Sequence, residues 1–172
     1  MGSISSCRRW GWALAIIALL SPLSSIAQSA SNGTGLPLPR FVSLRASEVN
    51  MRAGPGVRYP VEWVYKRQDL PVEVIAEFGT WRKVRDVEGT QGWVHQTMLS
   101  NRRTIAISGD SHTLRRQPRT DGDAIAMVEP GVIGNLIECP GDSEWCRVKV
   151  DQYVGWLRRA EFWGSYPGET VN

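Results

Sequence analysis

The sequence predicts an all-β protein built from two small barrels in tandem, after an N-terminal signal segment. Three observations lead to this fold class. Apolar residues alternate with polar ones in short segments, glycine and proline turns separate these segments, and the two halves of the chain repeat each other. Alternation with a period of two is typical of strands that bury one face, and many short strands with tight turns favour a small barrel.

The clearest predicted strand lies at residues 72–78. Its apolar side chains Val72, Val74, Ala76 and Phe78 alternate with residues of the opposite face. Further strands are expected at residues 81–87 and 92–95, and single helical turns at residues 96–99 and 159–162. No window outside the signal segment has a sustained helical period.

The second half of the chain repeats the first at an offset of about 63 residues. Four landmarks keep this offset to within one residue: Met51 with Leu114, Trp81 with Trp145, Trp93 with Trp156, and Leu99 with Phe162. Chance places one tryptophan pair in this way, but hardly four landmarks in the same order. We therefore expect residues 41–103 to form the first barrel and residues 104–166 the second.

The N-terminus has the composition of a secretion signal, residues 1–27. Arg8 and Arg9 precede an uncharged apolar run, and Ser25 and Ala27 are small residues suited to cleavage near Ala27. An uncleaved membrane anchor is the alternative, but the run is shorter than the roughly 20 apolar residues of a transmembrane helix. We expect a periplasmic or secreted protein that meets the membrane only transiently through its signal peptide.

Composition outside the barrels and overall charge narrow the function. Residues 28–40 are rich in Ser, Gly and Pro and are predicted to be a flexible leader, and residues 167–172 a tail. The chain has 20 basic residues and 17 acidic ones, and two of the basic ones leave with the signal. A nearly neutral protein does not recruit a polyanion by charge alone, so no nucleic-acid partner is expected.

Two cysteines, Cys139 and Cys146, remain after cleavage. A pair in an exported protein favours a disulfide and an oxidising compartment, and a reduced buried pair is the alternative. Two cysteines are too few for a structural zinc site unless His95 and His112 both joined them. No metal or cofactor is predicted.

The cysteine pair also predicts a hairpin register. If Cys139 faces Cys146, antiparallel pairing sets Ile137 opposite Val148, and opposed residues lie close enough for a disulfide.

The same register in the first unit places Ile75 opposite Val84 and Glu77 opposite Arg82. An ion pair would then occupy the position that the disulfide takes in the second unit.

An Asn-x-Arg-x-Gly-Pro turn at residues 50–55 and a closing Gly-Trp-Val strand at residues 92–94 resemble the bacterial SH3 (SH3b) domain family, in its exported alphaproteobacterial type. The resemblance covers residues 41–166 in two tandem copies. The second copy departs from the pattern, because Gln117 replaces the turn glycine and Arg119 follows the proline. The family implies a barrel of five or six strands and binding rather than catalysis.

The resemblance implies a non-catalytic exported binding module that recognises cell-wall peptide or peptidoglycan in the bacterial envelope. The alternative is an envelope protein–protein adaptor, a partner of a wall hydrolase or of a receptor. Many family members are fused to a wall hydrolase, and we expect no hydrolase segment here, since the two units use nearly the whole mature chain.

Aromatic side chains are the candidate ligand-binding residues, because SH3-type grooves hold extended peptides against aromatic walls. Tyr59, Trp63 and Tyr65 in the first unit and Tyr153 in the second are the surface candidates. Trp93 and Trp156 have two interpretations, closure of a small core or a share in a groove. The basic residues at 82–85 are interpreted as a solvated strand face rather than a binding stripe.

No catalytic residues are predicted. Cysteine catalysis needs a thiolate beside a base, but both cysteines lie in the predicted hairpin and both histidines lie in other segments. No glycine-rich phosphate loop or metal-ligand spacing is present in the sequence. A catalytic protein with an unrecognised site is the third hypothesis.

Overall fold

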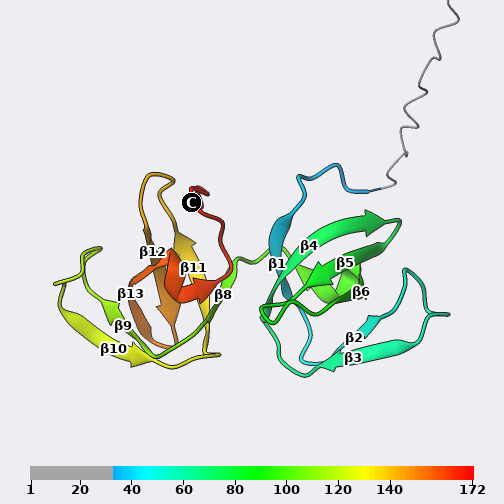
Figure 1. Cartoon of the computed structure of the whole chain (residues 1–172), viewed down its shortest axis with the longest axis horizontal. Coiled ribbons are helices and arrows are strands. Elements are labelled where there is room, and N and C mark those ends of the chain that lie inside the picture. Colours follow the sequence, from blue (N-terminus) through cyan, green and yellow to red (C-terminus); the bar gives the residue numbers. More distant parts are fainter. Residues whose placement is uncertain (1–32) are drawn as a thin grey trace, which may run out of the picture. The chain divides into compact units, whose positions relative to one another are not determined.

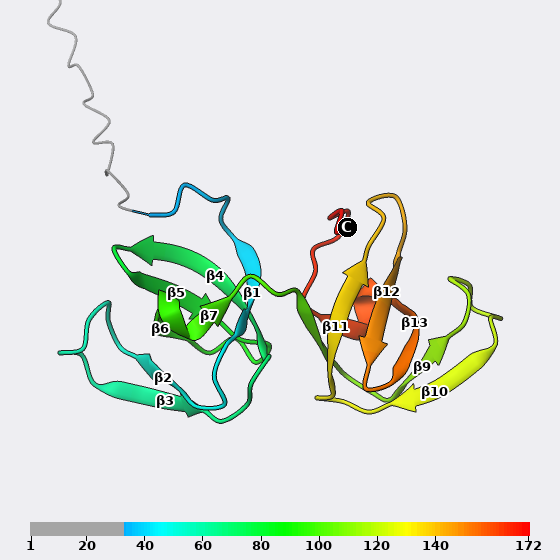
Figure 2. The ribbon, with the colours of Figure 1, turned by 180° about the vertical axis from the view of Figure 1, so that it is seen from behind.

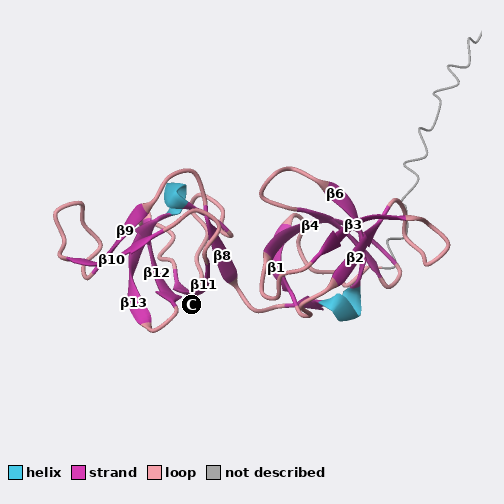
Figure 3. Cartoon of the chain, turned by 90° about the horizontal axis from the view of Figure 1, so that it is seen from below, coloured by secondary structure: helices cyan, strands magenta, loops and turns pink. Residues whose placement is uncertain are grey.

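The computed structural model describes residues 33–172, so the predicted signal peptide, residues 1–27, lies outside the described residues. The described chain forms two seven-stranded antiparallel sheets, each around a core of its own (Figure 1). Each sheet has one short 3-10 helix, at the expected positions (Figure 3). The predicted all-β class with two tandem barrels is confirmed. No helix within residues 33–172 is long and apolar enough to cross a membrane.

Barrel 1 runs from residue 40 to residue 100. Its elements are β1 (Arg40–Leu44), β2 (Val49–Arg52), β3 (Val61–Tyr65), β4 (Pro71–Phe78), β5 (Trp81–Arg85), β6 (Gln91–His95), η1 (Gln96–Met98) and β7 (Leu99–Ser100). The strands lie in the order β3-β2-β6-β5-β4-β1-β7. Figure 2 shows β7 beside β1 from behind.

Barrel 2 repeats this arrangement from residue 104 to residue 163. Its elements are β8 (Thr104–Ile107), β9 (His112–Arg115), β10 (Ala124–Val128), β11 (Ile133–Glu138), β12 (Trp145–Val150), β13 (Tyr153–Arg158), η2 (Arg159–Glu161) and β14 (Phe162–Trp163). The order β10-β9-β13-β12-β11-β8-β14 matches that of barrel 1 strand for strand. The repeat in the sequence is therefore a repeat of topology.

The glycine of each Gly-Trp motif allows two strands to approach closely. A Cβ atom on Gly92 of β6 would lie 2.5 Å from the Met51 side chain and 3.0 Å from the Arg52 carbonyl oxygen of β2. In barrel 2 a Cβ on Gly155 would lie 2.7 Å from the Arg115 carbonyl. Only glycine fits where the hairpin strand crosses the central strand at this distance.

The predicted hairpin register is wrong by one residue in the part of each hairpin that precedes Glu77 or Cys139, because each hairpin contains a β-bulge. Val74, not Ile75, lies opposite Val84, and the register shifts between Val74 and Ala76. The matching bulge in barrel 2 sets Leu136 opposite Val148 and leaves Ile137 exposed on the outside. A bulge adds one residue to one strand, which alternation alone does not reveal.

Beyond the bulge the register returns to the predicted one. Glu77 lies opposite Arg82, and the Arg82 Nε atom is 3.2 Å from the Glu77 carboxylate in a pair whose side chains are both 4% exposed. Arg82 also donates to the Gly79 carbonyl (2.7 Å) and to the Gln96 side chain (2.6 Å). The pair thus joins the β4–β5 turn to η1.

Further groups surround the Glu77 carboxylate. The Thr34 backbone N–H donates to it at 2.5 Å, and Arg40 Nη2 lies 2.5 Å from its other oxygen. Burial acts to raise the pKa of Glu77, but these donors and the charge of Arg40 outweigh it and hold the pKa at about 2. The described part of the predicted leader, residues 33–39, is therefore held against barrel 1 through Thr34.

Cys139 and Cys146 occupy the equivalent position in barrel 2 and form the predicted disulfide, with both side chains fully buried. The predicted tail, residues 167–172, covers it. Val171 exchanges backbone hydrogen bonds with Cys139 (2.8 and 3.0 Å) and belongs to the barrel 2 core. Figure 1 shows the C-terminus beside β11 and β12. The tail packs because it satisfies backbone groups of Cys139 that have no strand partner.

β14 and the segment after it also contact barrel 1. The ring centroid of Tyr166 lies 4.7 Å from that of Phe41, and the ring centroid of Trp163 lies 5.0 Å from that of Phe41. The Tyr166 hydroxyl donates to the Glu73 carboxylate at 2.7 Å, and Arg85 pairs with that carboxylate as well. Burial and the bond to Glu73 raise the pKa of Tyr166. Glu73 on the outside of barrel 1 is thereby buried.

Replacing both cysteines, C139A/C146A, is expected to lower the free energy of unfolding of barrel 2 by roughly 2.5 kcal/mol, the chain-entropy value for so short a loop. Chemical denaturation with and without reductant measures this. The variant should be insensitive to reductant, and equal stability of the two proteins without reductant would contradict the prediction.

Glu77 is expected to make barrel 1 acid-sensitive. Its folded pKa of about 2 lies below its ordinary value of 4.5, so its stabilising contribution is present above pH 4.5 and is lost as the pH falls toward 2. E77Q should lose roughly 3–5 kcal/mol at neutral pH, because Arg82 keeps a buried charge without its partner, and should flatten the acid limb of the stability curve. The exposed Glu62→Gln serves as the control, and an unchanged acid limb in E77Q would refute the assignment.

Candidate functional site

The β2–β3 hairpin projects from barrel 1 and ends in a long loop, residues 53–60 (Figure 1). Arg52 holds this loop from inside. Its Nη1 atom donates to the carbonyl oxygens of Val57 (3.2 Å) and Tyr59 (2.8 Å). Arg115, its counterpart in β9, donates to the Gly122 carbonyl at 3.0 Å. The arginine of the Asn-x-Arg motif therefore shapes the loop, because it satisfies carbonyl groups that no strand pairs with.

Tyr59 closes the loop on itself. A Cβ atom on Gly54 would lie 2.5 Å from the Tyr59 ring, so the ring rests against the glycine backbone. The Arg58 guanidinium lies 5.1 Å from the centre of the same ring. Any side chain at position 54 would collide with the Tyr59 ring, so glycine is required there. Tyr59 packs against the loop and does not project freely from it.

A groove of about 410 Å³ lies between this hairpin and the end of β6. We call it the barrel 1 groove. The residues that line it are Glu48, Asn50, Arg52, Val57, Trp81, His95, Thr97 and Met98. They come from the β1–β2 turn, β2, the hairpin loop, β5, β6 and η1, which are brought together only by the fold.

Trp81 and His95 form one wall of the barrel 1 groove. They lie opposite each other on β5 and β6, and their rings meet edge to face with centroids 5.3 Å apart. His95 Nδ1 lies 2.8 Å from the Thr97 hydroxyl, which fixes the imidazole at the start of η1. Val57 on the facing loop is 79% exposed. The groove thus combines an aromatic wall, an exposed aliphatic edge, and acidic and basic side chains.

In barrel 2 an arginine side chain occupies the space that corresponds to the barrel 1 groove. Arg158 replaces His95, and its guanidinium lies 5.2 Å from the centre of the Trp145 ring. Its Nη2 atom donates to the Thr120 hydroxyl at 2.6 Å, and Thr120 corresponds to Val57 in the hairpin loop. Arg158 therefore spans the gap between the Trp145 ring and the hairpin loop of barrel 2. The corresponding gap in barrel 1 is open.

The model of one protein family, described as the bacterial SH3 domain, matches this chain twice, at residues 45–101 and 108–164. The chain belongs to the bacterial SH3 domain family. The two matches coincide with the two barrels, so the resemblance expected from the sequence is confirmed in both copies, including the divergent second one.

Among solved structures, the chain is similar to NlpC1 and NlpC2 from Trichomonas vaginalis, each at 13% identity and a TM-score of 0.34. The matches cover 78% and 74% of this chain and 49% and 48% of theirs. An NlpC/P60 family protein from Bacillus cereus ATCC 10987 matches at 16% identity and a TM-score of 0.32, over 73% of this chain and 57% of its own. The chain thus spans about half the length of these proteins. No curated protein matches.

The three aromatic residues singled out in the first SH3 domain have different surroundings. Tyr59 lies in the hairpin loop, and Trp63 is 52% exposed on β3. The expectation that Tyr65 is a surface residue is wrong: it is 5% exposed, and its hydroxyl donates to Asp86 at 2.9 Å. Burial and the charge of Asp86 raise the pKa of Tyr65. Tyr65 is the last residue of β3, where the strand enters the core.

Trp93 and Trp156 do not close the cores, which corrects the interpretation of these residues as core-closing. Each stands on the outer face of its sheet, because the neighbouring Val94 and Leu157 take the inward positions and are fully buried. Tyr153 is exposed at the start of β13. No residue of the predicted set lines the barrel 1 groove, and a role for any of them in binding stays a prediction.

Trp81 was missed as a candidate although the sequence held a signal for it. It is one of the four landmarks of the repeat, paired with Trp145. A tryptophan that recurs at the end of a turn, outside the Gly-Trp motif, indicates a second aromatic position in each SH3 domain. Within residues 33–172, no three His, Cys, Asp or Glu side chains gather in a way that could hold a metal ion.

Removing the bridging arginine, Arg158→Ala, is expected to uncover the Trp145 ring in the second SH3 domain. The indole N–H resonance of Trp145, assigned with Trp145→Phe, should shift and become more accessible to a soluble paramagnetic probe. Arg116→Ala, an exposed arginine of the same domain, is the control. An unchanged Trp145 resonance in R158A would show that Arg158 does not cover the ring.

Proposed function

We propose that the protein is a non-catalytic exported binding module whose first SH3 domain holds an extended cell-wall peptide in the barrel 1 groove. The observation that carries this proposal is the difference between the two copies. The groove is open beside Trp81, whereas Arg158 crosses its counterpart beside Trp145. The second copy therefore lacks the open site, and binding is assigned to the first.

The chemistry of the barrel 1 groove suits a short peptide. An extended chain gains contact area on an aromatic wall with little loss of side-chain freedom, and Trp81 with His95 supplies such a wall. Glu48 and Asn50 on the hairpin side offer acceptors for an ammonium group, and the cationic Arg52 lies beside them. Wall peptides carry both amino and carboxylate groups, which fits this distribution of charge.

The disulfide supports export, because such bonds form in oxidising compartments rather than in the cytosol. Together with the predicted signal peptide it favours the periplasm or the exterior as the place of action. Cleavage near Ala27 belongs to this proposal. The membership of both domains in a family of binding modules supports a function without a catalytic step.

A protein partner in the envelope is the second candidate, and β3 is the observation in its favour. This strand is the first in the strand order of barrel 1, and Val61, Trp63 and Val64 on it are all exposed. An exposed apolar edge strand offers unpaired backbone groups to a strand from another protein. Loss of protein capture in W63A, with wall retention intact, would favour this adaptor.

Retention on purified peptidoglycan tests the proposed function. W81A should weaken retention by at least about tenfold, in keeping with the loss of a central aromatic anchor, whereas W145A should leave it unchanged. V57D on the opposite wall should weaken retention as well, with all variants checked by thermal melting. Equal loss in W81A and W145A, or no retention of the unaltered protein, would overturn the proposal.

A further inference from the structure

The outer face of the second SH3 domain carries tryptophan and cationic side chains in alternation. Arg147 of β12 lies opposite Trp156 of β13, and Trp156 lies opposite Arg115 of β9. One row further along, Trp145 lies opposite Arg158. Opposed residues on neighbouring strands point to the same face, so these side chains form one surface.

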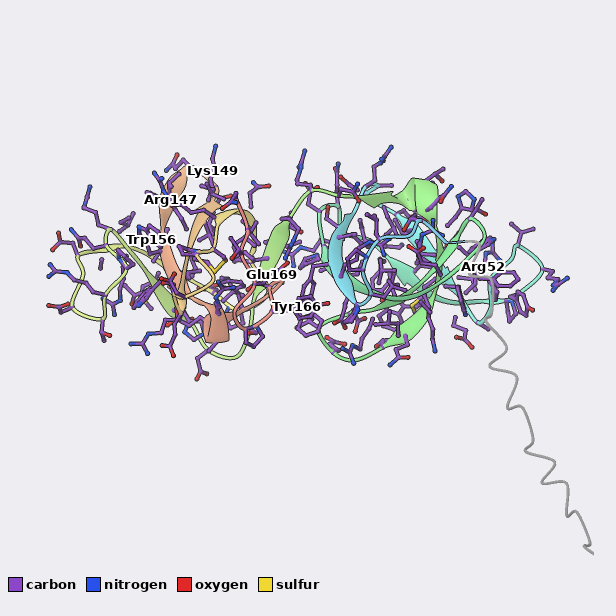
Figure 4. All side chains as sticks on the ribbon, turned by 90° about the horizontal axis from the view of Figure 1, so that it is seen from above. Arg52, Arg147, Lys149, Trp156, Tyr166 and Glu169 are labelled. Atoms are coloured by element: carbon purple, nitrogen blue, oxygen red, sulfur yellow. A yellow bond between two sulfur atoms is a disulfide. The ribbon has the colours of Figure 1, made fainter. Side chains whose placement is uncertain are left out.

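Lys149 extends this surface along β12. Arg147 and Lys149 are both exposed and are two residues apart on one strand, which separates their Cα atoms by about 7 Å. We call the six residues Arg115, Trp145, Arg147, Lys149, Trp156 and Arg158 the β12–β13 face. Figure 4 labels Arg147, Lys149 and Trp156 on the same side of barrel 2.

The charge of the β12–β13 face is largely uncompensated. Within the described chain, the one carboxylate that pairs with its four cations is Glu138, 3.8 Å from Arg147, and both of those side chains are well exposed. Such an exposed pair contributes little and yields readily to a competing anion. Arg115, Lys149 and Arg158 have no carboxylate partner within residues 33–172.

The first SH3 domain has a carboxylate at a position where the second has an amide. There Trp93 also lies between two cations, Arg52 and Lys83, but the third cation, Arg85, is neutralised by the buried Glu73. In barrel 2 the position of Glu73 is taken by Asn135, which lies opposite Lys149. The exchange of a carboxylate for an amide leaves the charge of Lys149 available to a ligand.

We propose that the β12–β13 face of the second SH3 domain binds an acidic polysaccharide. The half-buried Trp156 ring offers a flat apolar surface on which a sugar ring can lie. Arg147 opposite it, and Lys149 two residues further along β12, offer donors for the carboxylates of successive sugars. This site lies on the second SH3 domain, whereas the barrel 1 groove lies on the first.

Two observations favour a polysaccharide over other polyanions. The disulfide favours an oxidising compartment outside the cytosol, where polysaccharides are more abundant anionic polymers than nucleic acids. Trp156 is only partly exposed on a sheet face, whereas residues that enter a bilayer interface project large apolar groups beyond their charged neighbours. A repeating chain of carboxylates also matches cations spaced along one strand.

Binding to polygalacturonate tests this assignment, with neutral dextran as the uncharged comparison. R147Q/K149Q should weaken binding to polygalacturonate by at least about tenfold, since two charge-assisted hydrogen bonds are lost, and W156A should weaken it by about fivefold. R45Q/K66Q, which removes two exposed cations of barrel 1, should change it by less than about twofold at the same net charge. Thermal melting confirms that each variant is folded.

Three results would overturn the assignment. The first is equal weakening by R147Q/K149Q and R45Q/K66Q, which would show a non-specific charge effect. The second is equal binding to dextran and polygalacturonate. The third is binding to single-stranded DNA or to phosphatidylglycerol vesicles, sensitive to R147Q/K149Q, without binding to polygalacturonate.

Discussion

One cross-strand contact at the same position supports each barrel. It is the ion pair Glu77–Arg82 in barrel 1 and the disulfide Cys139–Cys146 in barrel 2. Both contacts are buried and join the two strands of a bulged hairpin near its turn, and a barrel this small has little other buried surface to fix that hairpin. The position also receives the ends of the described chain, since Thr34 bonds to Glu77 and Val171 pairs with Cys139.

The ion pair and the disulfide stabilise their hairpins through different physical effects. The ion pair is buried and is stabilised only as long as its hydrogen-bond donors are complete, which makes it sensitive to acid and to the loss of any partner. The disulfide restricts the unfolded chain and does not depend on pH in this way. Arg82 also donates to the side chain of Gln96, the first residue of η1. The ion pair is therefore linked to the residue that follows His95 of the groove wall.

The two SH3 domains share one strand order but differ in individual side chains on their outer faces. At the groove position, histidine in the first copy leaves the aromatic wall open, whereas arginine in the second lies over the wall and reaches the loop. On the outer face, glutamate in the first copy neutralises a cation, whereas asparagine in the second does not. Each exchange alters a side chain on the outside of its sheet without altering the strand order, which explains how one topology can present two kinds of site.

The sequence by itself determined the β class, the duplication, the disulfide and the opposition of Glu77 and Arg82. These features follow from short-range periodicity, from a constant offset and from pairing within a hairpin, all of which are local along the chain. The tertiary structure alone decided which residues of each bulged hairpin face inward, because the bulge places Val74 and Leu136, rather than Ile75 and Ile137, opposite the buried valine of the partner strand. It also decided the barrel 1 groove, whose residues come from six segments, and the position of Arg158 between Trp145 and the hairpin loop of barrel 2. A contact between distant segments depends on where the whole barrel places them, and no local pattern in the sequence carries that information.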